Sequence, residues 1–144
     1  MLKAVSLLGY LAMIGGLVTM LLLRRLFSLS PWVIAPQVAA VALMLWARIT
    51  FGRRSFHAVA NPTDGGLVTH GPYRYIRHPI YTAVCLFVTA GAVAHLSGIS
   101  LLLGGLVWAG ALTRMFCEER LVTERYPEYR PYAAKTPRMI PYLF

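Results

Sequence analysis

Four apolar runs alternate with polar segments along this chain. The first covers residues 4–23, and three more cover about 32–47, 79–94 and 99–116. Each is close to the roughly 20 residues that an α-helix needs to cross a bilayer. The pattern therefore predicts an all-α polytopic membrane protein with about four transmembrane helices, folded as a single domain over residues 1–144.

The first apolar run can be interpreted in two ways. Because Lys3 precedes it, the run is similar to a secretory signal peptide, in which an apolar segment follows a positive charge. The run is long for such a segment, and no small-residue cleavage site precedes Arg24 and Arg25. We therefore expect a first spanning helix.

The second apolar run contains two residues that are unusual inside a spanning helix. We expect Pro36 to lie in the first turn or to kink the helix. We expect Gln37 to hydrogen bond to a neighbouring helix, because its amide needs a partner in hydrocarbon.

The longest polar connection, residues 48–78, ends in a basic and aromatic stretch. Residues 65–81 read GGLVTHGPYRYIRHPIY and lead directly into the third apolar run. Proline is favoured at the first position of a helix, so His78-Pro79 predicts a helix entrance with Arg77 and Tyr81 beside it. A helix N-terminus suits a carboxylate or phosphate. The alternative is a membrane-surface loop whose Arg and Tyr side chains only anchor the next span.

Composition narrows the class of protein. The chain is 58% hydrophobic and carries a formal net charge of +9. The positive charges flank apolar spans, so an anionic lipid surface explains them better than nucleic acid. Cys85 and Cys117 have no CxxC partner, and the four His residues follow no metal-ligand spacing, so we expect no disulfide framework and no metal site.

The distribution of charge predicts the topology. With four spans, the N-terminus, the loop 48–78 and the tail 117–144 share one face of the membrane. Of the 14 Lys and Arg residues, only Arg24 and Arg25 fall on the other face. The positive-inside rule then places both termini in the cytoplasm of a cell (inner) membrane, with the loop and the tail together on that side.

The tail begins as a polar continuation of the fourth run. Arg114, Glu118 and Arg125 recur on one side of the expected helix. Arg114 is the charged residue of the tail that lies deepest in the membrane. In the alternative interpretation its side chain only extends to the membrane surface. Since no phosphate-binding glycine loop follows a strand, any cofactor must bind between the loop and the tail.

Two ordered motifs in these segments resemble the isoprenylcysteine carboxyl methyltransferase family of integral membrane enzymes. They are LVTHGPYRYIRHPIY at residues 67–81 and EERLVTERYPEYRPYAAKTPRMIPY at residues 118–142. Membrane phospholipid N-methyltransferases share much of this pattern. The resemblance covers roughly the C-terminal half of the chain and implies S-adenosyl-L-methionine as the cofactor.

The resemblance also implies site residues. An acceptor-orienting, catalytic role falls on Arg114. Cofactor binding falls on Gly65, Gly66, Leu67, Val68, Tyr73, His78, Pro79, Tyr81 and Glu118.

The chain departs from the family pattern at three points. Ala83 stands where the family usually has Gly, and Tyr126-Pro127 replaces Phe-Gly. One residue fewer precedes Tyr129, so Glu119 is an alternative to Glu118.

A mechanism follows from these assignments. Arg77 and the helix entrance would hold the cofactor's carboxylate, and Glu118 its ammonium or ribose hydroxyls. A lipophilic or lipid acceptor would enter from the bilayer and be methylated on a carboxylate or similar group. Only an amine or phenol would need a base, for which His70 and Glu119 are the nearest candidates.

Three other functions compete with this one. A membrane phospholipid N-methyltransferase is the nearest, followed by an NADPH-dependent reductase of the sterol type, to which the C-terminal region is distantly similar. A non-enzymatic membrane scaffold or transporter component predicts polar residues within the spans, where this chain has few.

Overall fold

The computed structural model describes residues 1–52 and 66–144. The helices are α1 (Leu2–Leu22), α2 (Pro31–Phe51), α3 (Pro79–Ala94), α4 (Gly98–Arg125) and α5 (Tyr129–Lys135), with a short 3-10 helix, η2 (Gly71–Arg74). The described residues contain no strand, which confirms the all-α prediction. Among the predicted site residues, Gly65 lies outside the described residues.

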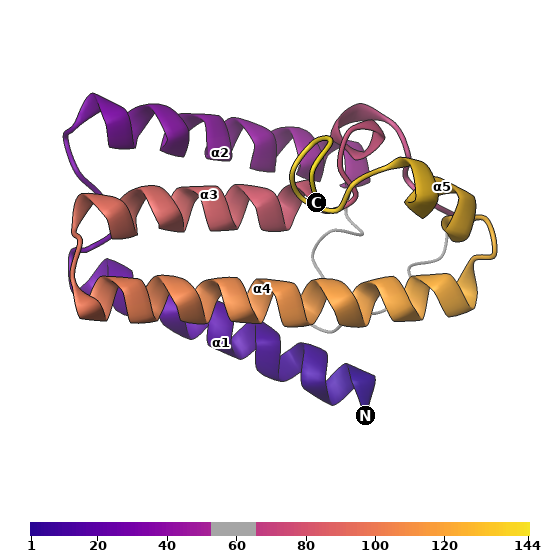
Figure 1. Ribbon diagram of the computed structural model, residues 1–144, viewed down its shortest axis with the longest axis horizontal. Coiled ribbons are helices and arrows are strands. Elements are labelled where there is room, and N and C mark those ends of the chain that lie inside the picture. Colours follow the sequence, from indigo (N-terminus) through magenta and orange to yellow (C-terminus); the bar gives the residue numbers. More distant parts are fainter. Residues whose placement is uncertain (53–65) are drawn as a thin grey trace.

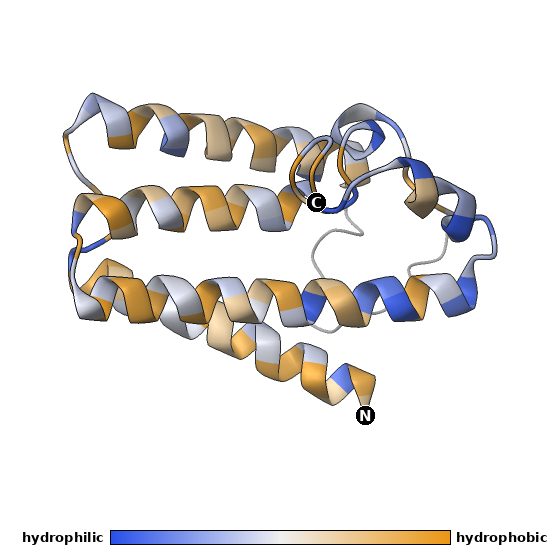
Figure 2. Cartoon of the chain, viewed as in Figure 1, coloured by the Kyte–Doolittle hydropathy of each residue, from blue (hydrophilic) through white to orange (hydrophobic). Residues whose placement is uncertain are grey.

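The long helices form a layer whose polar parts gather at one end. In this layer α3 packs against both α2 and α4, and α1 crosses α4 obliquely (Figure 1). The α1–α2 and α3–α4 connections lie at one end, and η2, α5 and the C-terminal segment lie toward the other. Hydrophilic residues gather on the last turns of α4 and on α5, while the rest of the layer is mainly hydrophobic (Figure 2).

Three of these helices are long and apolar enough to cross a membrane, namely α1, α2 and α4. The fourth expected span, α3, has the predicted bounds but only 16 residues, or about 24 Å of helix. The four-span topology therefore stays a prediction. The helix α4 has 28 residues, and its last turns extend beyond the apolar run to Arg125.

The main apolar core lies between α1, α3 and α4. Its most deeply buried members include Met20, Val88, Val107 and Met115, and Met139 of the C-terminal segment joins them. Many large apolar side chains of the long helices are exposed, among them Leu8, Val38 and Leu102, as expected for helices that face lipid.

Glycines set the distance between α1 and α4. A Cβ added at Gly9 would lie 2.9 Å from the Gly110 carbonyl oxygen, and one added at Gly110 would lie 2.8 Å from the Met13 nitrogen. Backbones approach this closely only where side chains are missing, and close packing is a main source of helix association in membranes. The contact fixes the position of α1 along α4.

Polar side chains hold the α1–α2 and α3–α4 connections in place, at the end of the layer opposite η2 and α5. The Gln37 amide donates to the Leu26 carbonyl oxygen at 2.7 Å and, more weakly, to that of Phe87 in α3 at 3.4 Å. This confirms the partner expected for Gln37. Arg25 donates to the Ser97 hydroxyl at 2.6 Å and joins the end of α1 to the start of α4. Pro36 lies within α2, more than a turn beyond its first residue, Pro31.

The contact between α1 and α4 gives a direct test of this packing. Gly110→Ala forces the backbones apart, so we expect it to lower the free energy of unfolding by about 1–3 kcal/mol. Gly105→Ala is the matched control, because a Cβ there meets no atom within 4 Å. Thermal unfolding in detergent measures both. Equal stability of the two variants would contradict the close approach of α1.

Candidate active site

The entrance to α3 is formed as the sequence predicts. Pro79 is the first residue of α3, and His78 is its N-cap. The C-terminal segment runs beside this entrance, because the backbone N–H groups of Arg77 and His78 donate to the carbonyl oxygens of Pro137 and Arg138, each at 2.9 Å. These two N–H groups are therefore already paired, so the candidates for anion binding at the entrance include the side chains of Arg77 and His78.

Glu119 lies at the centre of a cluster of two arginine side chains and one histidine side chain. Its Oε1 is 2.7 Å from Arg77 Nη1 and 3.1 Å from His78 Nε2, and its Oε2 accepts a hydrogen bond from Arg138 Nε at 3.0 Å. The Arg77, His78 and Glu119 side chains are 9%, 10% and 12% exposed. We call Arg77, His78, Glu119 and Arg138 the Glu119 cluster. It joins the start of α3, the end of α4 and the C-terminal segment.

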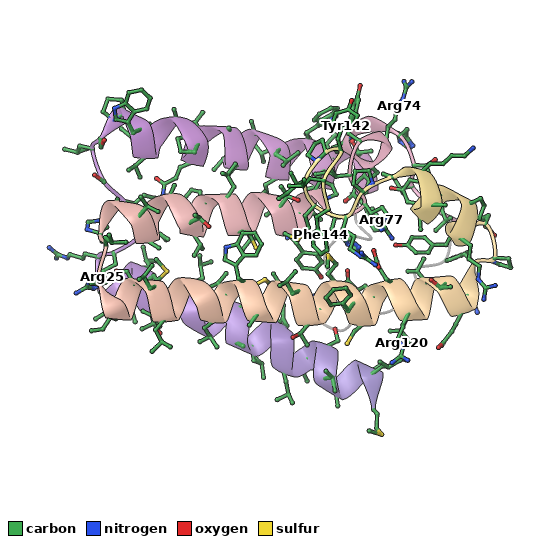
Figure 3. All side chains as sticks on the ribbon, viewed as in Figure 1. Arg25, Arg74, Arg77, Arg120, Tyr142 and Phe144 are labelled. Carbon is green, nitrogen blue, oxygen red and sulfur yellow. The ribbon has the colours of Figure 1, made fainter. Side chains whose placement is uncertain are left out.

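One nitrogen of the Glu119 cluster has no partner. The Nε atom of Arg77 is buried and makes no hydrogen bond to any described residue. A buried donor without a partner costs about 1–3 kcal/mol, so such atoms are rare and often belong to binding sites. Figure 3 shows Arg77 between the start of α3 and α4.

A second network lies one residue earlier on α4. Arg114 Nε donates to the Tyr81 hydroxyl oxygen, and the Tyr81 hydroxyl donates to Glu118 Oε1, each at 2.6 Å. Arg114 Nε and Glu118 Oε1 are 3.2 Å apart. Arg114 is 5% exposed, whereas the Glu118 side chain is 27% exposed. Arg114 is therefore a buried, hydrogen-bonded arginine and does not extend into solvent.

The loop before α3 packs against the end of α2. Val68 and Tyr73 form a small apolar cluster with Ala47, and Ile80 packs against it. Gly71 has φ +59, and a Cβ there would lie 2.7 Å from the Thr50 hydroxyl oxygen, so glycine is required at this turn. These contacts hold η2 beside α2 and bring Tyr73 toward the start of α3.

Tyrosines of α5 cover this loop. The Tyr132 hydroxyl donates to the Tyr73 carbonyl oxygen at 2.6 Å, and the Tyr129 and Tyr132 rings are in edge contact. Burial raises the pKa of Tyr129 to about 12 and raises that of Tyr73 as well. Both phenols are therefore protonated near neutral pH.

The structure brings most of the predicted site residues together and separates a few. Arg77, His78, Tyr81, Arg114 and Glu118 converge at the polar end of the layer. Val68 and Tyr73 lie in the adjoining apolar cluster, and Pro79 is buried beneath the entrance, while Gly66 is exposed and Leu67 is half-buried.

The two carboxylates that the sequence left as alternatives have different surroundings. Glu118 contacts Tyr81 and Arg114, while Glu119 contacts two arginines and His78. A carboxylate paired in this way is a weak base, which argues against Glu119 as the base considered for an amine or phenol acceptor. His70, the other candidate base, is exposed.

Sequence reasoning missed the contributions of the tail and of α1. Arg138 and Tyr129 lie in the tail motif, but no spacing rule places them beside Arg77. Tyr10 of α1, whose ring faces the Arg114 guanidinium, was missed as well, because a lone aromatic residue in an apolar run carries no signal.

A surface groove lies at the other end of the layer, between the first half of α2 and the end of α3. Its volume is about 480 Å³, and its lining includes Ser30, Trp32, Pro36, Thr89 and Val93. None of its lining residues is ionisable. The charged networks at the polar end are the better candidate for chemistry.

Arg, Tyr and Glu side chains gather at one end of a layer of apolar helices, three of which are long enough to cross a membrane. The model of the isoprenylcysteine carboxyl methyltransferase (ICMT) family matches residues 32–124, well over half of the chain. The chain therefore belongs to this family of membrane methyltransferases, which confirms the resemblance seen in the two motifs. The matched residues include all of α3 and nearly all of α2 and α4, but not α1.

Two bacterial relatives are similar to this chain. The cobalt-zinc-cadmium resistance protein CzcN of Cupriavidus metallidurans is 27% identical over 134 residues, which are 88% of this chain and 61% of that protein. The nickel-cobalt-cadmium resistance protein NccN of Alcaligenes xylosoxydans xylosoxydans is 37% identical over 83 residues, which are 54% of this chain and 37% of that protein. The chain thus spans less than two thirds of either relative. No solved structure matches it significantly.

The different surroundings of Glu118 and Glu119 predict different effects on stability. Glu119→Gln leaves Arg77 buried without its counter-ion, so we expect the free energy of unfolding to fall by about 3–5 kcal/mol. Glu118→Gln also removes the carboxylate partner of a buried arginine, but that carboxylate is more exposed and Arg114 keeps its hydrogen bond to Tyr81, so we expect a smaller loss. Thermal unfolding of the two variants without added ligand makes the comparison. A larger loss in Glu118→Gln would refute the central place of Glu119.

Proposed function

We propose that this chain transfers a methyl group from S-adenosyl-L-methionine to a lipophilic acceptor, by O-methylation of a carboxylate or a similar group. The observation that carries the proposal is the arrangement of charge at the polar end. A buried Arg77 with an unpaired Nε lies at the start of α3, and the partly exposed carboxylate of Glu118 lies on the facing α4. The methionine part of the cofactor carries a carboxylate and an ammonium group, so its two charges are complementary to these residues.

The proposed roles follow from this complementarity. The Arg77 and His78 side chains bind the carboxylate, and Glu118 binds the ammonium group or the ribose hydroxyls. The rings of Tyr73 and Tyr81 pack on adenine or face the sulfonium, since aromatic faces favour cations. Gly66, Leu67, Val68 and Pro79 form the wall of the site from the loop side, and Gly65 is proposed with them from the sequence motif.

Methyl transfer from a sulfonium needs mainly position and alignment. The bound cofactor supplies an electrophilic methyl group, and a carboxylate acceptor needs no base. The task of the protein is to hold the acceptor oxygen in line with that group, and such positioning supplies about 7–11 kcal/mol. Arg114, held by Tyr81 and Glu118, orients the acceptor's anionic group. An amine acceptor, as in phospholipid N-methylation, is the alternative.

We place the site on the cytoplasmic side of the inner membrane. The distribution of charge supports this placement, because the positive-inside rule puts the side with more Lys and Arg in the cytoplasm. Of the 14 Lys and Arg residues, only Arg24 and Arg25 are assigned to the end opposite the Glu119 cluster, where Figure 3 shows Arg25. An acceptor that partitions into lipid then reaches Arg114 from between the helices.

The names of the two relatives refer to resistance to metal cations. Among the described residues, no group of three His, Cys, Asp or Glu side chains is placed to hold a metal ion. We therefore propose for this chain that any contribution to metal tolerance comes from the methylated product.

Cofactor binding is the first test of the proposal. We expect detergent-purified protein to bind S-adenosylhomocysteine saturably in calorimetric titration, and His78→Ala to lose this binding because it removes a side chain of the anion site. A ligand at 100 times its dissociation constant adds about 2.7 kcal/mol of stability, so thermal unfolding gives a second readout.

Arg120→Gln is the matched control for the binding test. Arg120 is exposed and points away from Arg77 on the other side of α4 (Figure 3), so this variant retains binding while losing one positive charge. Stabilisation by NADPH in place of S-adenosylhomocysteine would reject the methyltransferase in favour of the reductase.

Turnover tests the role of Arg114. We expect Arg114→Ala to abolish transfer of labelled methyl groups from S-adenosylmethionine to a membrane lipid extract, because the acceptor loses its orienting cation. The dissociation constant for S-adenosylhomocysteine should change little. An active Arg114→Ala variant would remove Arg114 from the mechanism.

A further inference from the structure

The guanidinium of Arg114 contacts an aromatic ring as well as its hydrogen-bond partners. Its Nε atom is held by Tyr81 and Glu118. Its central carbon lies over the ring of Tyr10 from α1, 4.8 Å from the ring centroid. A cation over an aromatic face at this distance is attracted by the ring quadrupole, more strongly when both groups are shielded from water. Arg114 is 5% exposed, so the contact is largely desolvated.

The packing of α1 holds Tyr10 in this position. Gly9 precedes Tyr10, and Gly110 lies one helical turn before Arg114. The two glycines bring the backbones so close that a Cβ at either would collide with the other helix. Sliding or rotation of α1 would break this contact, so the position of the Tyr10 ring over Arg114 is fixed by the two backbones.

We propose that Tyr10 is a positioning residue for methyl transfer, and that through it α1 forms part of the site. This inference rests on the proposed function. Tyr10 fixes the plane of the Arg114 guanidinium, while Tyr81 and Glu118 fix its rotation in that plane. The acceptor then meets an arginine with one orientation. The family match begins at residue 32, so this contribution comes from a part of the chain outside the match.

Filling space is the alternative role for Tyr10, and it makes a different prediction. Tyr10 is half-buried at the edge of the main core, where another large apolar side chain would also pack. If the residue only fills space, leucine serves nearly as well as tyrosine. If the ring face holds Arg114, phenylalanine replaces tyrosine and leucine does not.

The test compares variants that separate these roles. We expect Tyr10→Phe to transfer labelled methyl groups to a membrane lipid extract at nearly the wild-type rate. We expect Tyr10→Leu to be about tenfold slower, as a desolvated cation–π contact would allow. Its dissociation constant for S-adenosylhomocysteine should stay unchanged. Met13→Leu is the control, because Met13 packs in the same contact between α1 and α4 near Gly110.

A spectroscopic readout tests the geometry without turnover. The guanidinium carbon of Arg114 lies 4.8 Å from the centroid of the Tyr10 ring, so the wild-type protein should show nuclear Overhauser effects between the Tyr10 ring protons and the Arg114 side-chain protons. Arg114→Lys assigns the signal. The effects should persist in Tyr10→Phe and in Met13→Leu and disappear in Tyr10→Leu. Because the wild-type protein gives this signal, the geometry is tested even if Tyr10→Leu does not fold.

The outcomes separate the two proposals. Absence of these effects between Tyr10 and Arg114 in the wild-type protein, or a Tyr10→Leu variant that is folded and as fast as the wild type, overturns the role of Tyr10 alone. If the wild-type protein binds no S-adenosylhomocysteine and transfers no methyl group, the proposed function fails and the role of Tyr10 in it fails as well.

Discussion

The ion pairs of Glu119 are the constraint on which the rest of the polar end depends. Arg77 and His78 enter from the start of α3, and Arg138 enters from the C-terminal segment. Burying charges is costly, and only a well-placed counter-ion with further hydrogen bonds offsets that cost. One carboxylate therefore draws three elements together, and the backbone of the tail then pairs with that of Arg77 and His78. The second network, around Tyr81, forms within this frame.

Packing in the apolar part of the molecule fixes the distances between the helices that carry the polar side chains. Gly9 and Gly110 lock α1 onto α4, and the core between α1, α3 and α4 is filled by Met20, Val88 and Met115. In a bilayer, such close packing takes the place of the hydrophobic effect between helices. The same helices therefore anchor the protein in lipid and hold the charged side chains at one end.

The sequence predicted the helices well because their signals are local. The apolar runs, the His78-Pro79 entrance and the periodicity of Arg114 and Glu118 are each set by neighbours within a few turns. The convergence of the loop and the tail at one end also followed, from charge alone. The sequence did not predict that a tail carbonyl would pair with Arg77, that Glu119 would contact two arginines and a histidine, or that Tyr10 would lie against Arg114. These contacts join residues far apart in the chain, and no local pattern encodes them.

The central claim is that the cofactor binds between the start of α3 and the end of α4. Photolabelling with an azido-adenine analogue of S-adenosylmethionine, followed by peptide mapping, tests this claim most directly. We expect labelled peptides from residues 66–81 and 114–138, and we expect S-adenosylhomocysteine to prevent the labelling. Competable labelling of the groove beside Trp32 and Thr89 instead would contradict the claim, because that groove lies at the other end of the layer.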